Sequence, residues 1–122
     1  MRDYRKLEAF QRSHELVKAV YQLTGTFPTD ERFGLTSQLR RAAVSIASNI
    51  VEGSARSSET EYCRFLEIAH SSSWEVGYQL TLAEELGCCA KEGEYIKRAK
   101  ELADHASRLL GRLIQAIGKE RT

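Results

Sequence analysis

Residues 34–56 read GLTSQLRRAAVSIASNIVEGSAR, and this stretch decides the fold class. Its apolar residues recur at steps of three and four, which is the spacing of one face of an α-helix. These residues are Leu35, Leu39, Ala42, Ala43, Ile46 and Ile50. Gly53 follows the last of them, at a position where a helix commonly ends in a left-handed glycine cap. The sequence therefore predicts an amphipathic helix that ends near Gly53.

The same stretch carries a second stripe of short or hydrogen-bonding residues, Ser45, Asn49 and Glu52. Two helix backbones can approach closely at such a stripe. If the stripe is buried, its polar groups need partners, because an unmatched buried group costs about 1–3 kcal/mol. Arg41 and Arg56 are the nearest candidates, and Glu52 is the charge that they would meet. The alternative is that Ser45 and Asn49 face water, as polar residues on helices usually do.

Length and composition indicate one soluble globular domain that spans residues 1–122. The apolar fraction is 42% and the charged fraction is 29%, values typical of globular proteins. The net charge of +1 gives no argument for nucleic acid or for an anionic membrane as a partner. No apolar run is long enough to span a bilayer, and the start, MRDYRKLEAF, lacks the apolar core of a signal peptide. We expect a cytoplasmic protein with no membrane partner.

Three cysteines, Cys63, Cys88 and Cys89, agree with a reducing compartment. An odd count without a framework spacing does not predict a disulfide scaffold. The adjacent pair is neither a CxxC redox motif nor a zinc knuckle. We expect Cys88 and Cys89 to fill space near the end of a helix.

One further helix is predicted near each end of the chain. The first, over about residues 4–24, has its main apolar row at Leu7, Phe10, His14, Val17 and Tyr21, flanked by Leu16, Val20 and Leu23. The last, over about residues 92–117, has its main row at Tyr95, Ala99, Leu102, Ala106, Leu109, Leu113 and Ala116, flanked by Ile96, Ala103, Leu110 and Ile117. Gly118 is expected to end this helix, and residues 119–122 are expected to fray.

The longest predicted helix covers about residues 57–86 and carries two apolar rows. The first is heptad-like, the mark of near-parallel helix packing, and consists of Tyr62, Leu66, Ala69, Ser73, Val76, Leu80 and Ala83. The second consists of Trp74, Tyr78 and Leu82 and points nearly the opposite way at 100° per residue. One face packs inside a bundle, so the other needs a different partner. We interpret it as a subunit interface, because large aromatics are enriched there; the alternative is cover by the first helix or the loops.

Four helices with short connections predict an all-α, antiparallel, up-down-up-down four-helix bundle. Bundles of this kind can hold two metal ions on paired Glu-x-x-His motifs. Glu67 and His70 form one such motif, but His105 has Leu102 three residues before it, so the second motif is missing. There is also no Gly-rich phosphate loop, and Ser71–Ser73 lack the strained turn and paired base that activate a serine. We therefore expect no metal, no cofactor and no catalytic residue, and an enzyme only through residues that folding brings together.

Arginines form the one candidate set for nucleic-acid binding: Arg40, Arg41, Arg56 and Arg64. Arginines contact phosphates, which supply most non-specific nucleic-acid affinity. Elsewhere basic residues alternate with acidic ones, notably over residues 91–112, and a mixed-sign helix face is usually a solvated surface. Oligomerisation would strengthen the nucleic-acid interpretation over that of a solvated surface, because a ring repeats any local basic patch several times.

The stretch FPTDERFGLTSQLRRAAVSIASNIVEGSAR, followed by YCRFLEIAHSSSWEVGYQL, resembles the four-helix-bundle family named for proteins encoded by intervening sequences in 23S rRNA genes. The resemblance covers about residues 4–117. It implies an antiparallel four-helix bundle and assembly as a closed ring, typically a homopentamer. Related accessory variability proteins of diversity-generating retroelements are basic and bind nucleic acid and a reverse transcriptase; this chain is nearly neutral. The resemblance transfers no catalytic residue. The two opposed apolar rows of the helix over residues 57–86 favour a non-enzymatic, ring-forming bundle that acts as a scaffold or interaction module. The arginine set and the family link favour the alternative, an RNA- or DNA-binding accessory protein.

Overall fold

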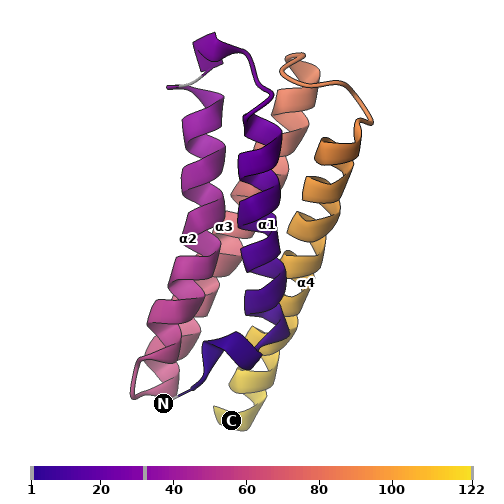
Figure 1. Ribbon diagram of the computed structural model, residues 1–122. Helices are drawn as coiled ribbons and strands as arrows, with labels where there is room; N and C mark the ends of the chain where they lie inside the picture. The colour runs from indigo at the N-terminus through magenta and orange to yellow at the C-terminus, as the bar shows by residue number, and fades with distance from the viewer. Residues whose placement is uncertain (1, 32, 122) are drawn as a thin grey trace.

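The computed structural model describes residues 2–31 and 33–121, and over these residues the chain is built from helices alone. The elements are η1 (Tyr4–Lys6), α1 (Glu8–Thr24), η2 (Thr29–Glu31), α2 (Leu35–Ser54), α3 (Glu59–Glu85) and α4 (Glu94–Arg121). The chain rises through α1, descends through α2, rises through α3 and descends through α4 (Figure 1). Each of α1 and α3 packs against both α2 and α4. The predicted antiparallel four-helix bundle is confirmed.

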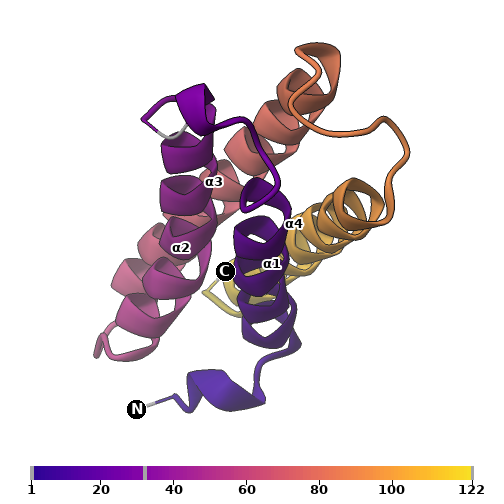
Figure 2. The ribbon, with the colours of Figure 1, turned by 45° about the horizontal axis from the view of Figure 1, so that its top comes forward.

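The connections divide between the two ends of the bundle. The α1–α2 and α3–α4 connections lie at one end, as Figure 2 shows. The N-terminal segment and the α2–α3 turn lie at the other end. Residues far apart in the sequence therefore meet at this second end, where Arg2 N donates a hydrogen bond to the oxygen of Ser54 at 3.4 Å.

The predicted core faces of α2 and α3 are confirmed. All six residues of the α2 row are buried, with exposures between 0 and 9%. The heptad-like row of α3 is also buried throughout, from Tyr62 at 4% to Ala83 at 0%. Both rows contain mostly aliphatic or small residues, so the apolar period alone locates the buried side of each helix.

The predicted main row of α1 is confirmed only in part: Leu7, Phe10 and Val17 pack against the margin of the core, because the core face is turned toward the flanking row. Leu16 and Val20 are fully buried, whereas His14 and Tyr21 are exposed. The buried row runs through Ser13, whose hydroxyl donates to the oxygen of Ala9 at 2.6 Å. A serine that bonds to its own helix can be buried without an unmatched polar group, and its polar side chain hid the row from the hydrophobic pattern.

The core face of α4 lies between the two rows predicted for it. The flanking residues Ile96, Ala103, Leu110 and Ile117 are buried, whereas Tyr95 at the head of the predicted main row is 44% exposed. An α-helix of 3.6 residues per turn drifts by about 20° per heptad relative to a strict seven-residue repeat. A seven-residue row along a helix as long as α4 therefore leaves the core at its ends.

Both glycines expected to end helices lie inside helices. α2 continues through Gly53 to Ser54, and α4 continues through Gly118 to Arg121. Gly53 is buried against α3, and a Cβ placed on it would lie 2.8 Å from Phe65 Cβ. This glycine allows two helices to approach closely rather than providing a cap. The left-handed glycine of the bundle is Gly87, with φ of 76°, at the end of α3.

The helix starts also differ in detail from the prediction. Residues 4–6 form the 3-10 helix η1, because Leu7 takes an extended conformation with ψ of 127° before α1 begins. Ser58 caps α3 by accepting a hydrogen bond from Glu61 N at 3.1 Å, and Glu59 and Glu61 occupy the first turn of that helix. Cys88 is buried just after α3, and this burial raises the pKa of its thiol.

Candidate functional site

A surface groove lies between α3 and α4 and has two aromatic side chains on one wall. Trp74 is 70% exposed and Tyr78 is 65% exposed. Gly77 lies between them in sequence, and a Cβ placed on it would have no heavy atom within 4 Å. The groove has a volume of about 510 Å³. Its lining residues are Ser73, Trp74, Gly77, Tyr78 and Thr81 of α3 and Lys100, Ala103, Asp104 and Ser107 of α4.

The charged residues of the groove are already paired. Lys100 forms an ion pair with Glu84, and Asp104 accepts from Arg108 at 2.9 Å. The hydrogen bond from Lys100 lowers the pKa of Glu84, against a smaller effect of burial in the opposite direction. A partner that enters the groove thus meets aromatic and small side chains in the middle and neutralised charges at the rim.

Leu82 does not share the exposure of the other two residues in its predicted row. It is partly buried and packs against the hydrophobic core, so Trp74 and Tyr78 alone form the exposed apolar wall. The row drifts around the helix by about 40° at each four-residue step, which turns Leu82 toward the bundle.

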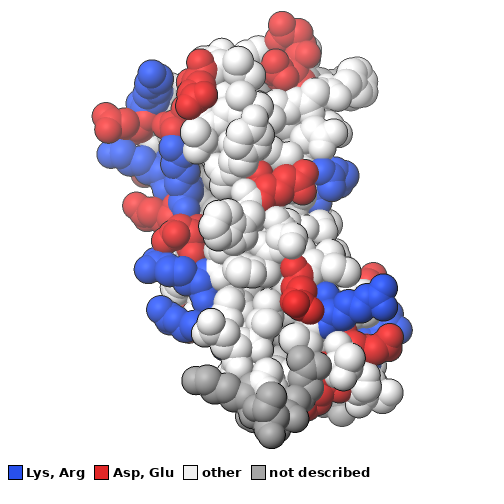
Figure 3. Space-filling view, turned by 180° about the vertical axis from the view of Figure 1, so that it is seen from behind, with Lys and Arg blue, Asp and Glu red and all other residues white. Residues whose placement is uncertain are grey.

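Figure 3 shows the face of the molecule opposite to the view of Figure 1, and an uncharged band runs along it from top to bottom. Acidic side chains border this band near the centre, and Lys and Arg lie further toward the two margins. Protein interfaces share this pattern, in which charged residues are depleted at the core of the contact and polar residues form the rim. This face therefore has the composition of a contact surface.

The predicted polar stripe is partly buried, and its members bond to one another rather than to arginines. Ser45 and Ser72 join α2 to α3 through a 3.1 Å hydrogen bond between their hydroxyls. Asn49 donates to the oxygen of Ser45 at 2.8 Å and to its hydroxyl at 3.1 Å. Glu52 is exposed. The stripe is thus a polar contact between two helices of one chain.

The arginines expected to satisfy the stripe have other partners. Arg41 binds Glu75 of α3 at 2.7 Å and Gln38 at 2.9 Å. The guanidinium of Arg56 lies over the ring of Phe65, with Cζ at 4.7 Å from the ring centre. The expectation that these two arginines meet Glu52 is therefore wrong.

The four arginines proposed for nucleic-acid binding do not form one patch on a single chain. Arg40 donates to Thr24 of α1 at 2.8 Å and lies over Tyr21, whereas Arg41 pairs with α3. Arg56 follows the other end of α2, and Arg64 lies on α3 and is exposed. Fourteen residues of helix, or about 21 Å, lie between Arg40 and Ser54, where α2 ends. Arg40 and Arg41 are therefore nearer one end of the bundle, and Arg56 and Arg64 are near the other.

The remaining candidate chemistry is limited within the part of the chain that the structure describes. No three His, Cys, Asp or Glu side chains there are grouped so that they could hold a metal ion. No helix there is both long enough and apolar enough to cross a bilayer.

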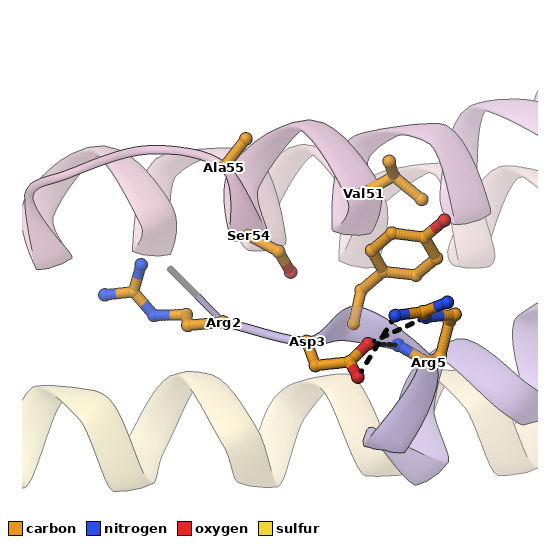
Figure 4. Close-up of a pocket in the computed structure, with 7 residues that line it drawn as sticks. Arg2, Asp3, Arg5, Val51, Ser54 and Ala55 are labelled. Atoms are coloured by element: carbon orange, nitrogen blue, oxygen red, sulfur yellow. Dashed lines mark hydrogen bonds and ion pairs between the residues drawn. The ribbon is translucent and has the colours of Figure 1, made fainter.

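Sequence reasoning missed two hollows at the end of the bundle where the chain begins. One has a volume of about 330 Å³ and is lined by Arg2, Asp3, Tyr4 and Arg5 with Val51, Ser54 and Ala55 of the α2 end. In Figure 4 the carboxylate of Asp3 faces Arg5, while the Arg2 side chain extends away from that pair. A second hollow, of about 500 Å³, is lined by Arg2, Ala55, Arg56 and Ser57. Only the folded chain brings residues 2 and 56 together, so no local signal could reveal this site.

The fold and the mainly uncharged α3 face define an all-α bundle with a candidate contact surface. Comparison with known proteins identifies the family: the model of the 23S rRNA-intervening sequence protein family matches residues 5–112. The chain belongs to this family, which confirms the resemblance. A solved structure from Bacteroides thetaiotaomicron VPI-5482, described as a protein of unknown function from the S23 ribosomal protein family, is similar at 21% identity and a TM-score of 0.79. The similarity covers 88% of this chain and 95% of that one. No curated protein matches the chain.

Proposed function

We propose that this protein is a non-enzymatic, ring-forming bundle that acts as a scaffold or interaction module in the cytoplasm. The observation that carries the proposal is the exposure of Trp74 and Tyr78 beside the groove between α3 and α4. A monomer that leaves two large aromatic side chains in water forgoes the free energy of burying them, which is about 1.5–3 kcal/mol for a large apolar side chain. A second copy of the chain is the partner we assign to this surface.

Three features support self-association through this surface. The aromatic wall lies beside Gly77, which has no side chain, and Ala103, which has a small one, and this leaves room for a side chain of another subunit. The charges at the groove rim are neutralised by partners in the same chain. Family membership makes a closed ring, and in particular a homopentamer, the specific form of the proposal.

The experiment is light scattering on a size-exclusion column, with the wild-type chain and the double variant Trp74→Gln, Tyr78→Gln. The wild type is expected to elute as an oligomer at micromolar concentration. Aromatic residues at the centre of an interface contribute about 2 kcal/mol or more each, so each substitution is expected to raise Kd about 30-fold. The double variant should elute as a smaller species with unchanged helical circular dichroism.

Tyr95→Gln is the matched control, because Tyr95 is an aromatic residue of α4 that is 44% exposed and does not line the groove. This variant should assemble as the wild type does. A monomeric wild type, or a double variant that assembles normally, would refute the proposal.

An RNA- or DNA-binding accessory protein is the second candidate. It is favoured by Arg56 and Arg64, which form no ion pair with a carboxylate among the described residues and would recur in each subunit of a ring. Binding to structured RNA should then weaken steeply as the salt concentration rises. Arg64→Gln should reduce the slope of the logarithm of the binding constant against the logarithm of the salt concentration. Absent or salt-independent binding at low salt would exclude this mode.

A further inference from the structure

The hollow lined by Arg2, Ala55, Arg56 and Ser57 has the features of a small anion site and is independent of the proposed ring. We propose that Arg2 and Arg56 together bind the phosphate group of a phosphate monoester in this hollow. The proposal rests on three properties of the two arginines: they are held in place, they are free of carboxylate partners, and they line the same space.

The N-terminal segment fixes Arg2 at the α2–α3 turn. Asp3 caps η1 by accepting from Arg5 N at 3.1 Å, and the Tyr4 ring packs edge-on against Phe10 with 4.8 Å between the ring centres. Arg2 itself bonds through its backbone N to Ser54 and through Nη1 to the oxygen of Arg56 at 3.0 Å. These contacts hold the first described residue of the chain against the end of α2.

Both guanidinium groups lie on aromatic rings. Arg2 Cζ is 4.0 Å from the centre of the Tyr62 ring, and Arg56 Cζ is 4.7 Å from the centre of the Phe65 ring. Stacking fixes the plane of a guanidinium but leaves its N–H groups, which lie in that plane, able to donate. An arginine held in this way loses less conformational freedom when it binds an anion.

The two arginines have no competing carboxylate within ion-pair distance among the residues that the structure describes. Asp3, the acidic residue nearest in sequence to Arg2, is engaged by Arg5 at 3.0 Å. Glu59 and Glu61, in the first turn of α3, reduce the local positive potential. We therefore expect a weak site, with a Kd on the order of 1 mM.

The chemistry of the lining selects a phosphate monoester. Two arginine forks and the Ser57 hydroxyl supply donors for three terminal oxygens. A monoester carries up to two negative charges near neutral pH, whereas a diester carries one and has only two unesterified oxygens. The volume of about 500 Å³ leaves space beside the phosphate for a small organic group.

The test is a phosphorus NMR titration of the intact chain, in which inorganic phosphate is the first probe and sodium chloride holds the ionic strength constant. Saturable line broadening is expected below about 20 mM phosphate, where a millimolar site is nearly full. Arg2→Gln and Arg56→Gln should each weaken binding at least about tenfold, because each removes a charged fork. Arg2→Lys should restore binding in part, since it returns the charge without the fork.

Lys97→Gln is the matched control, because it removes one positive charge from the start of α4, at the opposite end of the bundle. It should bind as the wild type does. Methyl phosphate and dimethyl phosphate then separate a monoester from a diester source: methyl phosphate should compete and dimethyl phosphate should not. No saturable broadening, unchanged binding in both Gln variants, or equal competition by the diester would each overturn the proposal.

Discussion

Gly53→Ala tests whether close approach, rather than chain reversal, is the role of the glycine at the end of α2. Gly53 is buried within the helix. In an exposed helical position, the same substitution stabilises a protein by about 0.5–1 kcal/mol. At Gly53 the new methyl group would lie 2.8 Å from Phe65 Cβ and 3.3 Å from both Tyr62 Cδ1 and the Tyr62 carbonyl oxygen.

The size of the effect follows from these distances. Carbon atoms in contact prefer separations of about 3.5–4.0 Å, and the contact here would be 2.8 Å, so α2 and α3 must move apart by roughly 0.7–1.2 Å at this level. The Phe65 Cβ is fixed to the backbone, and rotation of a side chain cannot relieve the contact. Overpacking of this kind costs about 1–3 kcal/mol. After the gain in helix propensity, we expect a net loss of about 0.5–2 kcal/mol.

The assay is urea unfolding followed by circular dichroism, at one protein concentration for all variants, because assembly makes apparent stability concentration-dependent. The midpoint should fall while the m-value stays constant. Gly118→Ala is the matched control, since Gly118 also lies inside a helix but has no heavy atom within 4 Å of its Cβ position. It should be neutral or stabilising by up to about 1 kcal/mol. A Gly53→Ala protein as stable as the wild type would refute the close-packing argument.

Three further predictions concern the core, the groove and the ion pair beside it. Leu66 is fully buried, so Leu66→Ala should lower the free energy of unfolding by about 2–5 kcal/mol, measured in the same urea assay. Gly77→Ala should leave the fold intact, because its Cβ position is open, but the added methyl group should weaken assembly on the size-exclusion column; unchanged assembly would place the contact elsewhere. Lys100 lowers the pKa of Glu84, so the stabilisation is present above the unfolded pKa of about 4.3 and is lost as the pH falls through the folded value. Lys100→Met should therefore reduce stability at pH 7 and approach the wild type only as the pH falls through the lowered pKa of folded Glu84, and a deficit that persists in stronger acid would assign the effect to packing instead.

The candidate contact surface was predictable in part. Trp74 and Tyr78 lie opposite the heptad-like row of α3, so their exposure follows from the helical period. Leu82 was assigned to the same surface, but helical rotation and the packing of neighbouring helices bring it to the core margin. The prediction that four arginines form one nucleic-acid-binding set is wrong for a related reason. Arg40 and Arg41 are adjacent in sequence, but adjacent residues on a helix point about 100° apart. Arg40 therefore contacts α1, and Arg41 contacts α3.

The sequence by itself determined the number of α-helices and the buried faces of α2 and α3, because apolar periodicity is a local property that survives in any packing arrangement. The family was recognisable from the sequence through its resemblance over residues 27–56 and 62–80, and the family model confirms it. Tertiary packing alone decided which row of α1 is buried: the rest of the bundle covers Ser13, and the hydrogen bond from its hydroxyl to the oxygen of Ala9 satisfies the polar group there. It also decided that Gly53 is a contact point, because the neighbour that excludes a side chain there belongs to α3. The meeting of Arg2 and Arg56 has the same origin: fifty-four positions separate them, and only the packing of α1 beside α2 brings the start of the chain to the α2–α3 turn.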